Sequence, residues 1–129
     1  MARTQPAKPT EAELAILRVL WQCGPSTVRE VKEALDRDKP TGYTTVLKLM
    51  QIMLDKGLLD RDESQRSHVY RTAVPAEKTQ RQLVSDLIDR AFEGSARKLV
   101  MQALSSQQAS PDELKTIRSL LDEIEGRSS

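Results

Sequence analysis

The sequence contains few of the residues that most catalytic and metal sites use. It has one histidine and one cysteine in 129 residues, which excludes a histidine-based metal cluster, a disulfide within the chain and a cysteine-rich metal site. Its five glycines are scattered and form no phosphate-binding loop. The carboxylates fall mostly on the solvent sides of expected helices. We therefore expect a protein that is not an enzyme and that has no metal or cofactor.

Aromatic residues are also scarce, at 3%, and the 38% of apolar residues indicate a modest aliphatic core. No apolar run approaches the roughly 20 residues that a membrane-spanning helix needs. The first nine residues have no apolar segment typical of a secretory signal, and residues 1–9 are expected to form a disordered arm. We therefore expect a cytoplasmic protein without membrane insertion.

Neither sign of charge is in large excess, because the net charge is only +1. Residues 1–75 carry 12 basic and 10 acidic side chains, whereas residues 76–129 carry 8 and 9. A surface that binds nucleic acid would therefore have to be local, and the charge distribution weakly favours the first part of the chain.

Three helices are predicted in the first part of the chain. Thr10 and Glu13 have the spacing of a capping box that opens the first helix. Ser26 is the expected cap of the second, and Gly57 is the expected stop of the third. The expected helices cover residues 10–23, 26–35 and 41–56.

Two short β-like segments follow, at residues 58–61 and 67–72, and the polar residues 62–66 between them have the length of a hairpin loop. His68 is interpreted either as a partly exposed strand residue or as a phosphate or pH-sensitive contact in the wing. Helix, helix, helix, strand, loop, strand is the order of a winged helix-turn-helix. We therefore predict a mainly α fold with a small β-wing, in which residues 10–74 form a DNA-binding domain.

The chain after Pro75 is purely helical in pattern, with three amphipathic stripes. Ser110 and Glu113 again have capping-box spacing at the start of the last helix. Three such short helices have little to bury alone, and the first domain has partners for its own apolar faces. Residues 75–129 are therefore predicted to be a three-helix dimerisation region. Its expected interface residues are Leu83, Leu87, Ile88, Leu99, Val100, Leu104, Leu114, Ile117 and Leu121.

The third predicted helix carries the best candidate site. At 100° per residue its apolar side chains share an arc of about 160°, and small polar side chains lie opposite. Hydroxyl, amide and ammonium groups of this kind suit the edges of bases and the phosphates of a major groove. An ordinary solvent-facing helix would have the same pattern, but the order of the elements favours DNA. The predicted DNA-binding residues are Thr41, Tyr43, Thr44, Thr45, Lys48 and Gln51, with Arg66 and Ser67 on the wing.

Several segments resemble the penicillinase repressor family, which includes the methicillin-resistance repressor and copper-responsive relatives. They are Leu17–Trp21 with Gly24-Pro25, Thr27–Val31, Tyr43–Val46 with Lys56–Leu58, Val69–Arg71, Gly94-Ser95 and Leu99–Leu104. The resemblance extends over residues 10 to about 125 and is more specific before Pro75 than after it. It implies a homodimeric repressor on a palindromic operator. In the penicillinase branch it also implies a sensor protease whose signal leads to cleavage in the dimerisation domain.

Three departures from the family pattern matter. Ile52 stands where the family usually has arginine, so a basic contact is missing and operator preference or affinity is expected to differ. Gln102 and Ala103 form the candidate cleavage region, where the well-studied repressors have Asn-Phe, so the inactivating protease differs or is absent. The cysteine-rich tail of the copper-responsive members is missing, and copper sensing through thiolates is not expected.

Two alternatives to a repressor released through its dimerisation region remain open. One is a winged-helix protein-interaction module, because a net charge of +1 does not compel DNA binding. The other is a winged-helix regulator that responds to a small ligand held between the tail and the winged helix.

Overall fold

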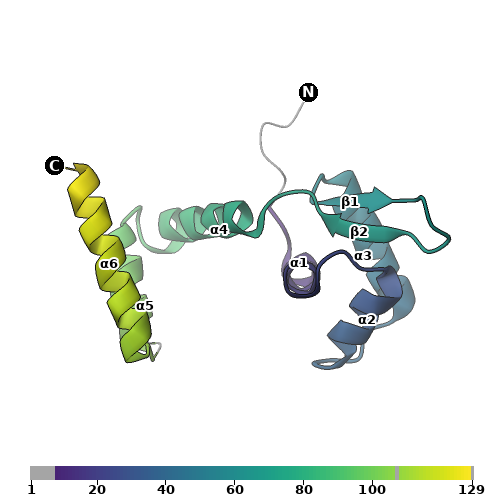
Figure 1. Ribbon diagram of the computed structural model, residues 1–129, viewed down its shortest axis with the longest axis horizontal. Helices are drawn as coiled ribbons and strands as arrows, with labels where there is room; N and C mark the ends of the chain where they lie inside the picture. The colour runs from purple at the N-terminus through teal and green to yellow at the C-terminus, as the bar shows by residue number, and fades with distance from the viewer. Residues whose placement is uncertain (1–7, 107, 129) are drawn as a thin grey trace. The chain divides into compact units, whose positions relative to one another are not determined.

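The computed structural model describes residues 8–106 and 108–128. Its elements are α1 (Glu11–Cys23), α2 (Val28–Asp36), α3 (Tyr43–Asp55), β1 (Leu59–Asp62), β2 (Val69–Thr72), α4 (Ala76–Ala91), α5 (Ala96–Ser106) and α6 (Pro111–Ser128) (Figure 1). The chain divides into an N-terminal unit, Met1–Val84, and a C-terminal unit, Ser85–Ser129. The order of elements confirms the predicted winged helix followed by further helices.

Side-chain caps fix where the first two helices begin. Thr10 Oγ1 accepts the backbone N–H of Glu13 at 3.2 Å, and Glu13 Oε1 accepts that of Thr10 at 2.9 Å. Thr27 and Glu30 repeat this capping box at α2. The prediction that Ser26 caps α2 is wrong, because Ser26 is buried and its backbone pairs instead with β2.

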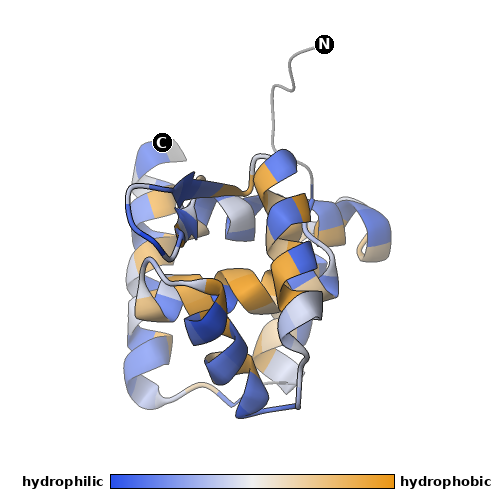
Figure 2. Ribbon diagram, turned by 90° about the vertical axis from the view of Figure 1, so that its right-hand side faces the viewer, coloured by the Kyte–Doolittle hydropathy of each residue, from blue (hydrophilic) through white to orange (hydrophobic). Residues whose placement is uncertain are grey.

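The core of the N-terminal unit lies among its first three helices and the wing. Its buried apolar residues are Ile16, Leu17, Leu20, Val28, Val31, Val46, Met50, Met53, Leu58, Leu59 and Tyr70. The hydrophobic segments of the helices are orange in Figure 2, whereas the wing loop is blue. Three of these residues, Val46, Met50 and Met53, come from α3. The core therefore holds α3 by its apolar face and leaves the opposite face exposed.

The wing is an antiparallel hairpin with Leu59 paired to Thr72 and Asp62 paired to Val69. The first strand begins one residue later than predicted, since the Leu58 N–H donates to the Met53 carbonyl (2.9 Å) at the end of α3. The second strand begins two residues later, so the loop spans residues 63–68. The bridge between Ser26 and β2 fastens the wing to the turn before α2.

Gly57 follows α3 with a φ of +81°. A Cβ at this position would meet no atom within 4 Å, so only the backbone conformation opposes a side chain. We expect Gly57→Ala to lower the free energy of unfolding by about 1–2 kcal/mol, measured by urea denaturation. Gly126→Ala is the matched control, because Gly126 lies within α6 and also has open space around its Cβ. That substitution should be neutral or slightly stabilising, and equal losses at both positions would contradict the proposed cause.

The C-terminal unit contains the end of α4, together with α5 and α6. The predicted capping box opens α6, where Ser110 Oγ accepts the Glu113 N–H at 3.1 Å. None of residues 85–106 and 108–127 is buried. The exposed large apolar side chains of this unit are Leu87, Val100, Met101, Leu104, Leu114, Leu120, Leu121 and Ile124. One copy of the chain therefore provides no buried core among these helices.

Candidate nucleic-acid interface

The turn between α2 and α3 sets where α3 begins. Asp36 accepts a hydrogen bond from Lys32 at 2.6 Å and another from the Thr41 N–H at 2.9 Å. The bond from Lys32, and after it that from Thr41, holds the pKa of Asp36 below its ordinary value. The Thr41 hydroxyl donates to the Lys39 carbonyl at 3.0 Å. Thr41, predicted to contact DNA, therefore already takes part in fixing this turn.

The side of α3 that faces away from the core is exposed along its whole length. The exposed residues are Tyr43, Thr44, Thr45, Lys48, Gln51, Ile52 and Asp55. At 100° per residue, Thr44, Lys48, Gln51 and Asp55 fall within a sector of about 60°, with Ile52 beside it. The five residues of α3 predicted to bind DNA are thus all exposed, and three of them share this sector.

The two charged side chains of this face differ in sign. Lys48 makes no hydrogen bond or ion pair within the part of the chain that the structure describes, so its ammonium group is available to an external partner. Asp55 lies two turns further along, at the end of α3. The positive charge therefore lies near the middle of the face, and the negative charge lies at its end.

A polar cleft of about 560 Å³, the wing cleft, opens between the start of α2, the start of α3 and the wing. Its lining residues are Thr27, Val28, Arg29, Tyr43, Leu47, Arg66, Ser67, His68 and Tyr70. The cleft brings the predicted Arg66 and Ser67 together with Tyr43. It also brings in His68, which is exposed in the loop rather than in the strand. Two arginines and one histidine along one cleft suit the phosphates of a nucleic-acid backbone.

Arg29 is a candidate contact that is not among the residues predicted from the sequence. It is exposed in the first turn of α2, and it joins the wing cleft only because the chain brings α2 and the wing together. The available signal is local: Arg29 follows the cap Thr27 by two residues, at the start of the helix that precedes α3.

Arg61, by contrast, is engaged within the wing. Hydrogen bonding with Tyr70, and after it the ion pair with Glu63, raises the pKa of Arg61. Asp62 accepts the Ser64 N–H at 2.9 Å and helps to shape the start of the loop. Arg66, further along the loop, is therefore better placed than Arg61 to meet an external anion.

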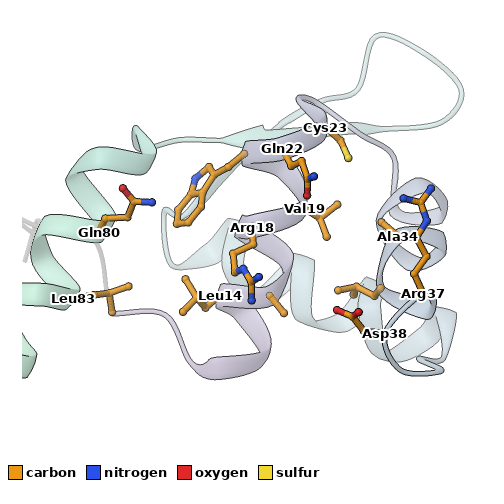
Figure 3. Close-up of a pocket in the computed structure, with 13 residues that line it drawn as sticks. Leu14, Arg18, Val19, Gln22, Cys23, Ala34, Arg37, Asp38, Gln80 and Leu83 are labelled. Carbon is orange, nitrogen blue, oxygen red and sulfur yellow. The ribbon is translucent and has the colours of Figure 1, made fainter. Parts of the chain in front are cut away.

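A second cleft, of about 670 Å³, runs beside α1 (Figure 3). Leu14, Arg18 and Val19 of α1 line it, with Arg37 from the turn after α2 and Leu83 from α4. No residue of α3 or of the wing lines this cleft. It therefore lies apart from the predicted DNA-binding residues and adds no side chain to them.

The candidate cleavage pair, Gln102 and Ala103, lies inside α5 and is exposed. The Ser106 hydroxyl donates to the Gln102 carbonyl at 2.7 Å, and the Ser105 hydroxyl donates to the Met101 carbonyl at 2.6 Å. Because proteases cleave locally opened backbone, cutting at this pair would require α5 to unwind first.

Comparison with known proteins decides the family. The family model described as Penicillinase repressor matches residues 9–123. The chain belongs to the penicillinase repressor family. It is 28% identical over 116 residues to the transcriptional regulator BlaI of Mycobacterium tuberculosis, covering 89% of this chain and 83% of that protein. It is 21% identical over 118 residues to the penicillinase repressor of Bacillus licheniformis, covering 92% of each chain.

A solved structure supports the fold of this penicillinase repressor family member. The solution structure of the Bacillus licheniformis BlaI monomeric form in complex with the blaP half-operator has a TM-score of 0.50 and 20% identity, covering 57% of this chain and 89% of that one. Members of the family are winged-helix transcriptional regulators and not enzymes. None of the helices in the described part of the chain combines the length and apolar character needed to cross a membrane.

Proposed function

We propose that this protein is a homodimeric transcriptional repressor that binds a palindromic operator through its winged helix. The observation that carries this proposal is the exposed face of α3, which has the wing cleft at its start. Near the middle of this face is Lys48, which has no partner among residues 8–106 and 108–128. A relative with the same fold is a BlaI whose monomeric form binds a half-operator. Family membership and this face together support DNA as the partner.

The dimensions and chemistry of α3 suit a major groove. Its 13 residues span about 20 Å, and a B-DNA major groove about 12 Å wide admits one helix. Gln51 has the amide that pairs with adenine, and Lys48 can reach a guanine edge or a phosphate. Arg29 and Arg66 in the wing cleft would hold the backbone and set the register, without reading sequence.

A second copy is needed because one short helix makes few base contacts. Two linked copies read two half-sites, and their binding free energies combine less the cost of association. The exposed apolar side chains of the C-terminal unit supply a surface for pairing. Of the nine predicted dimerisation residues, Leu87, Val100, Leu104, Leu114 and Leu121 are exposed, whereas Leu83, Ile88, Leu99 and Ile117 are partly buried.

Release from DNA would follow from any signal that separates the two copies. A signal that unwinds α5 would act on the pairing surface directly, because this helix carries Val100, Met101 and Leu104, all exposed. A sensor protease that cuts at Gln102-Ala103 is the candidate that the family suggests, and it would require that unwinding.

The proposal is tested by gel shift on DNA from upstream of the protein's own gene, at several salt concentrations. We expect Lys48→Ala to weaken binding about fivefold to tenfold and to reduce the slope of log K against log salt by about 1 per half-site, if Lys48 neutralises a phosphate. Reduced affinity with an unchanged slope would assign Lys48 to a base edge instead.

Lys115→Ala is the control, since it removes the same charge from an exposed site on α6 and should alter neither quantity. If the parent protein shows no salt-sensitive binding to any duplex, the repressor proposal fails. That outcome would favour the protein-interaction module.

A further inference from the structure

Within the winged helix, residues 10–74, two large apolar side chains are exposed, and both are on α3. Tyr43 is 46% exposed and Ile52 is 38% exposed. Single apolar residues occur on any protein surface. Here, however, the rest of this part of the chain buries or half-buries such side chains, and the two exceptions lie on the proposed DNA-reading helix.

The two exposed residues have different surroundings. Tyr43 lines the wing cleft, so neighbouring residues of the same chain surround part of its ring. Ile52 lines neither the wing cleft nor the cleft beside α1. It lies one helical turn after Lys48 and two turns after Thr45, on one edge of the exposed face. The exposed part of the Ile52 side chain is therefore open to a partner from outside this unit.

The chemistry of isoleucine narrows what that contact can be. An aliphatic side chain has no hydrogen-bond donor or acceptor, so it cannot pair with the polar edge of a base. Among the four bases, the apolar group exposed in the major groove is the C5-methyl of thymine. The Thr45 methyl lies on the same flank, about 20° away around the helix, and extends the apolar edge.

We propose that Ile52 reads a thymine methyl group in each operator half-site. This inference rests on the proposed function, since it requires α3 to lie in the major groove. Lys48, one turn away, would bind the neighbouring phosphate or guanine. This contact would fix the position of Ile52 relative to the base pairs in the major groove. Ile52 is thereby a specificity-determining residue that selects an A·T pair at one position.

The test begins with selection of binding sites from a random duplex library by the full-length protein. Each thymine of the selected half-site is then replaced, one at a time, by deoxyuridine, which lacks the methyl group. We expect one position at which binding weakens about fourfold per half-site, the factor that corresponds to about 0.8 kcal/mol for one buried methyl-sized group. Replacing that T·A pair by 5-methylcytosine·guanine should weaken binding less than replacing it by cytosine·guanine.

The protein variants complete a double-mutant cycle. Ile52→Ala should bind the thymine and uridine duplexes equally at that position, while Ile52→Val retains most of the difference. Gln51→Ala, on the adjacent exposed residue, should lower affinity but preserve the uridine effect. Ile52 is 38% exposed and Gln51 is exposed, so we expect every variant to remain folded at the temperature of the binding assay, which its thermal unfolding curve checks.

The outcomes separate the two proposals. A protein that selects no DNA overturns the proposed function. A protein that selects a site with no methyl-sensitive thymine, or whose uridine effect is the same in the parent and in Ile52→Ala, overturns the role of Ile52 and leaves the repressor proposal intact.

Discussion

The double variant Leu104→Asp and Leu121→Asp should bind a palindromic operator at least about 100-fold more weakly than the parent protein does. Its affinity for an isolated half-site should stay the same. The two leucines are 43% and 54% exposed and lie on α5 and α6. In the proposed dimer they would be covered, and a carboxylate buried there without a partner is strongly unfavourable. Loss of the dimer removes the avidity of two linked sites, a factor of 10²–10⁴.

The winged helix should be unaffected, because neither leucine belongs to its core. Sedimentation gives the oligomeric state, and fluorescence anisotropy with one-site and two-site duplexes gives the two affinities. Ser119→Asp is the matched control, since it places the same charge about 160° around α6 from Leu121, on the side away from the apolar stripe.

Two results would contradict this account. A doubly substituted protein that remains a dimer would show that the pairing surface lies elsewhere. A substituted protein that is a monomer and still binds the palindrome as tightly as the parent would show that pairing does not set the affinity.

The order of the elements could be predicted because its signals are local. Thr10 with Glu13, and Ser110 with Glu113, mark helix starts within four residues of sequence, and both capping boxes are present. The exposed face of α3 could be predicted in the same way, because helical periodicity alone places Lys48 on the solvent side and Val46 on the core side.

Features that depend on contacts distant in sequence could not be predicted. Ser26 has the chemistry of a cap, but its backbone bonds to Tyr70 at 2.9 and 2.8 Å, and Thr27 caps α2 instead. Arg29 becomes a candidate contact only in the folded chain, where the wing loop and the start of α2 line the same cleft. Glu13 is recognisable as a capping residue, whereas its partner Lys56 is 43 residues away.

That partner gives Glu13 a second role, which joins the start of α1 to the end of α3. The Glu13 side chain is 2% exposed, and Lys56 Nζ donates to its two oxygens at 2.8 and 2.9 Å. Burial alone would raise the pKa of Glu13. The hydrogen bonds from Lys56 and from the Thr10 N–H outweigh burial and hold the pKa below its ordinary value of 4.5.

Lys56→Met should lower the free energy of unfolding by about 3 kcal/mol at pH 7, because it leaves a buried carboxylate without its cation. The double variant Glu13→Gln and Lys56→Met should recover most of this loss, since glutamine can still cap Thr10 and carries no charge. Urea unfolding of the parent, the single variants and the double variant gives the coupling free energy directly. A double variant no more stable than Lys56→Met would mean that the loss comes from packing of the lysine stem.

The pH dependence of the free energy of unfolding provides a second, independent test of the Glu13–Lys56 pair. In the parent, the folded-state pKa of Glu13 is lowered, so the stability that the pair contributes is complete above about pH 5 and is lost as the pH falls through the lowered pKa. In Lys56→Met, burial is no longer outweighed by the cation, and the pKa of Glu13 should rise. That variant should therefore lose stability, relative to the double variant, as the pH increases from 4 to 7, whereas the parent gains it. If the free energy of unfolding of the parent and of Lys56→Met changed with pH in parallel, the charge of Glu13 would not be what joins the start of α1 to the end of α3.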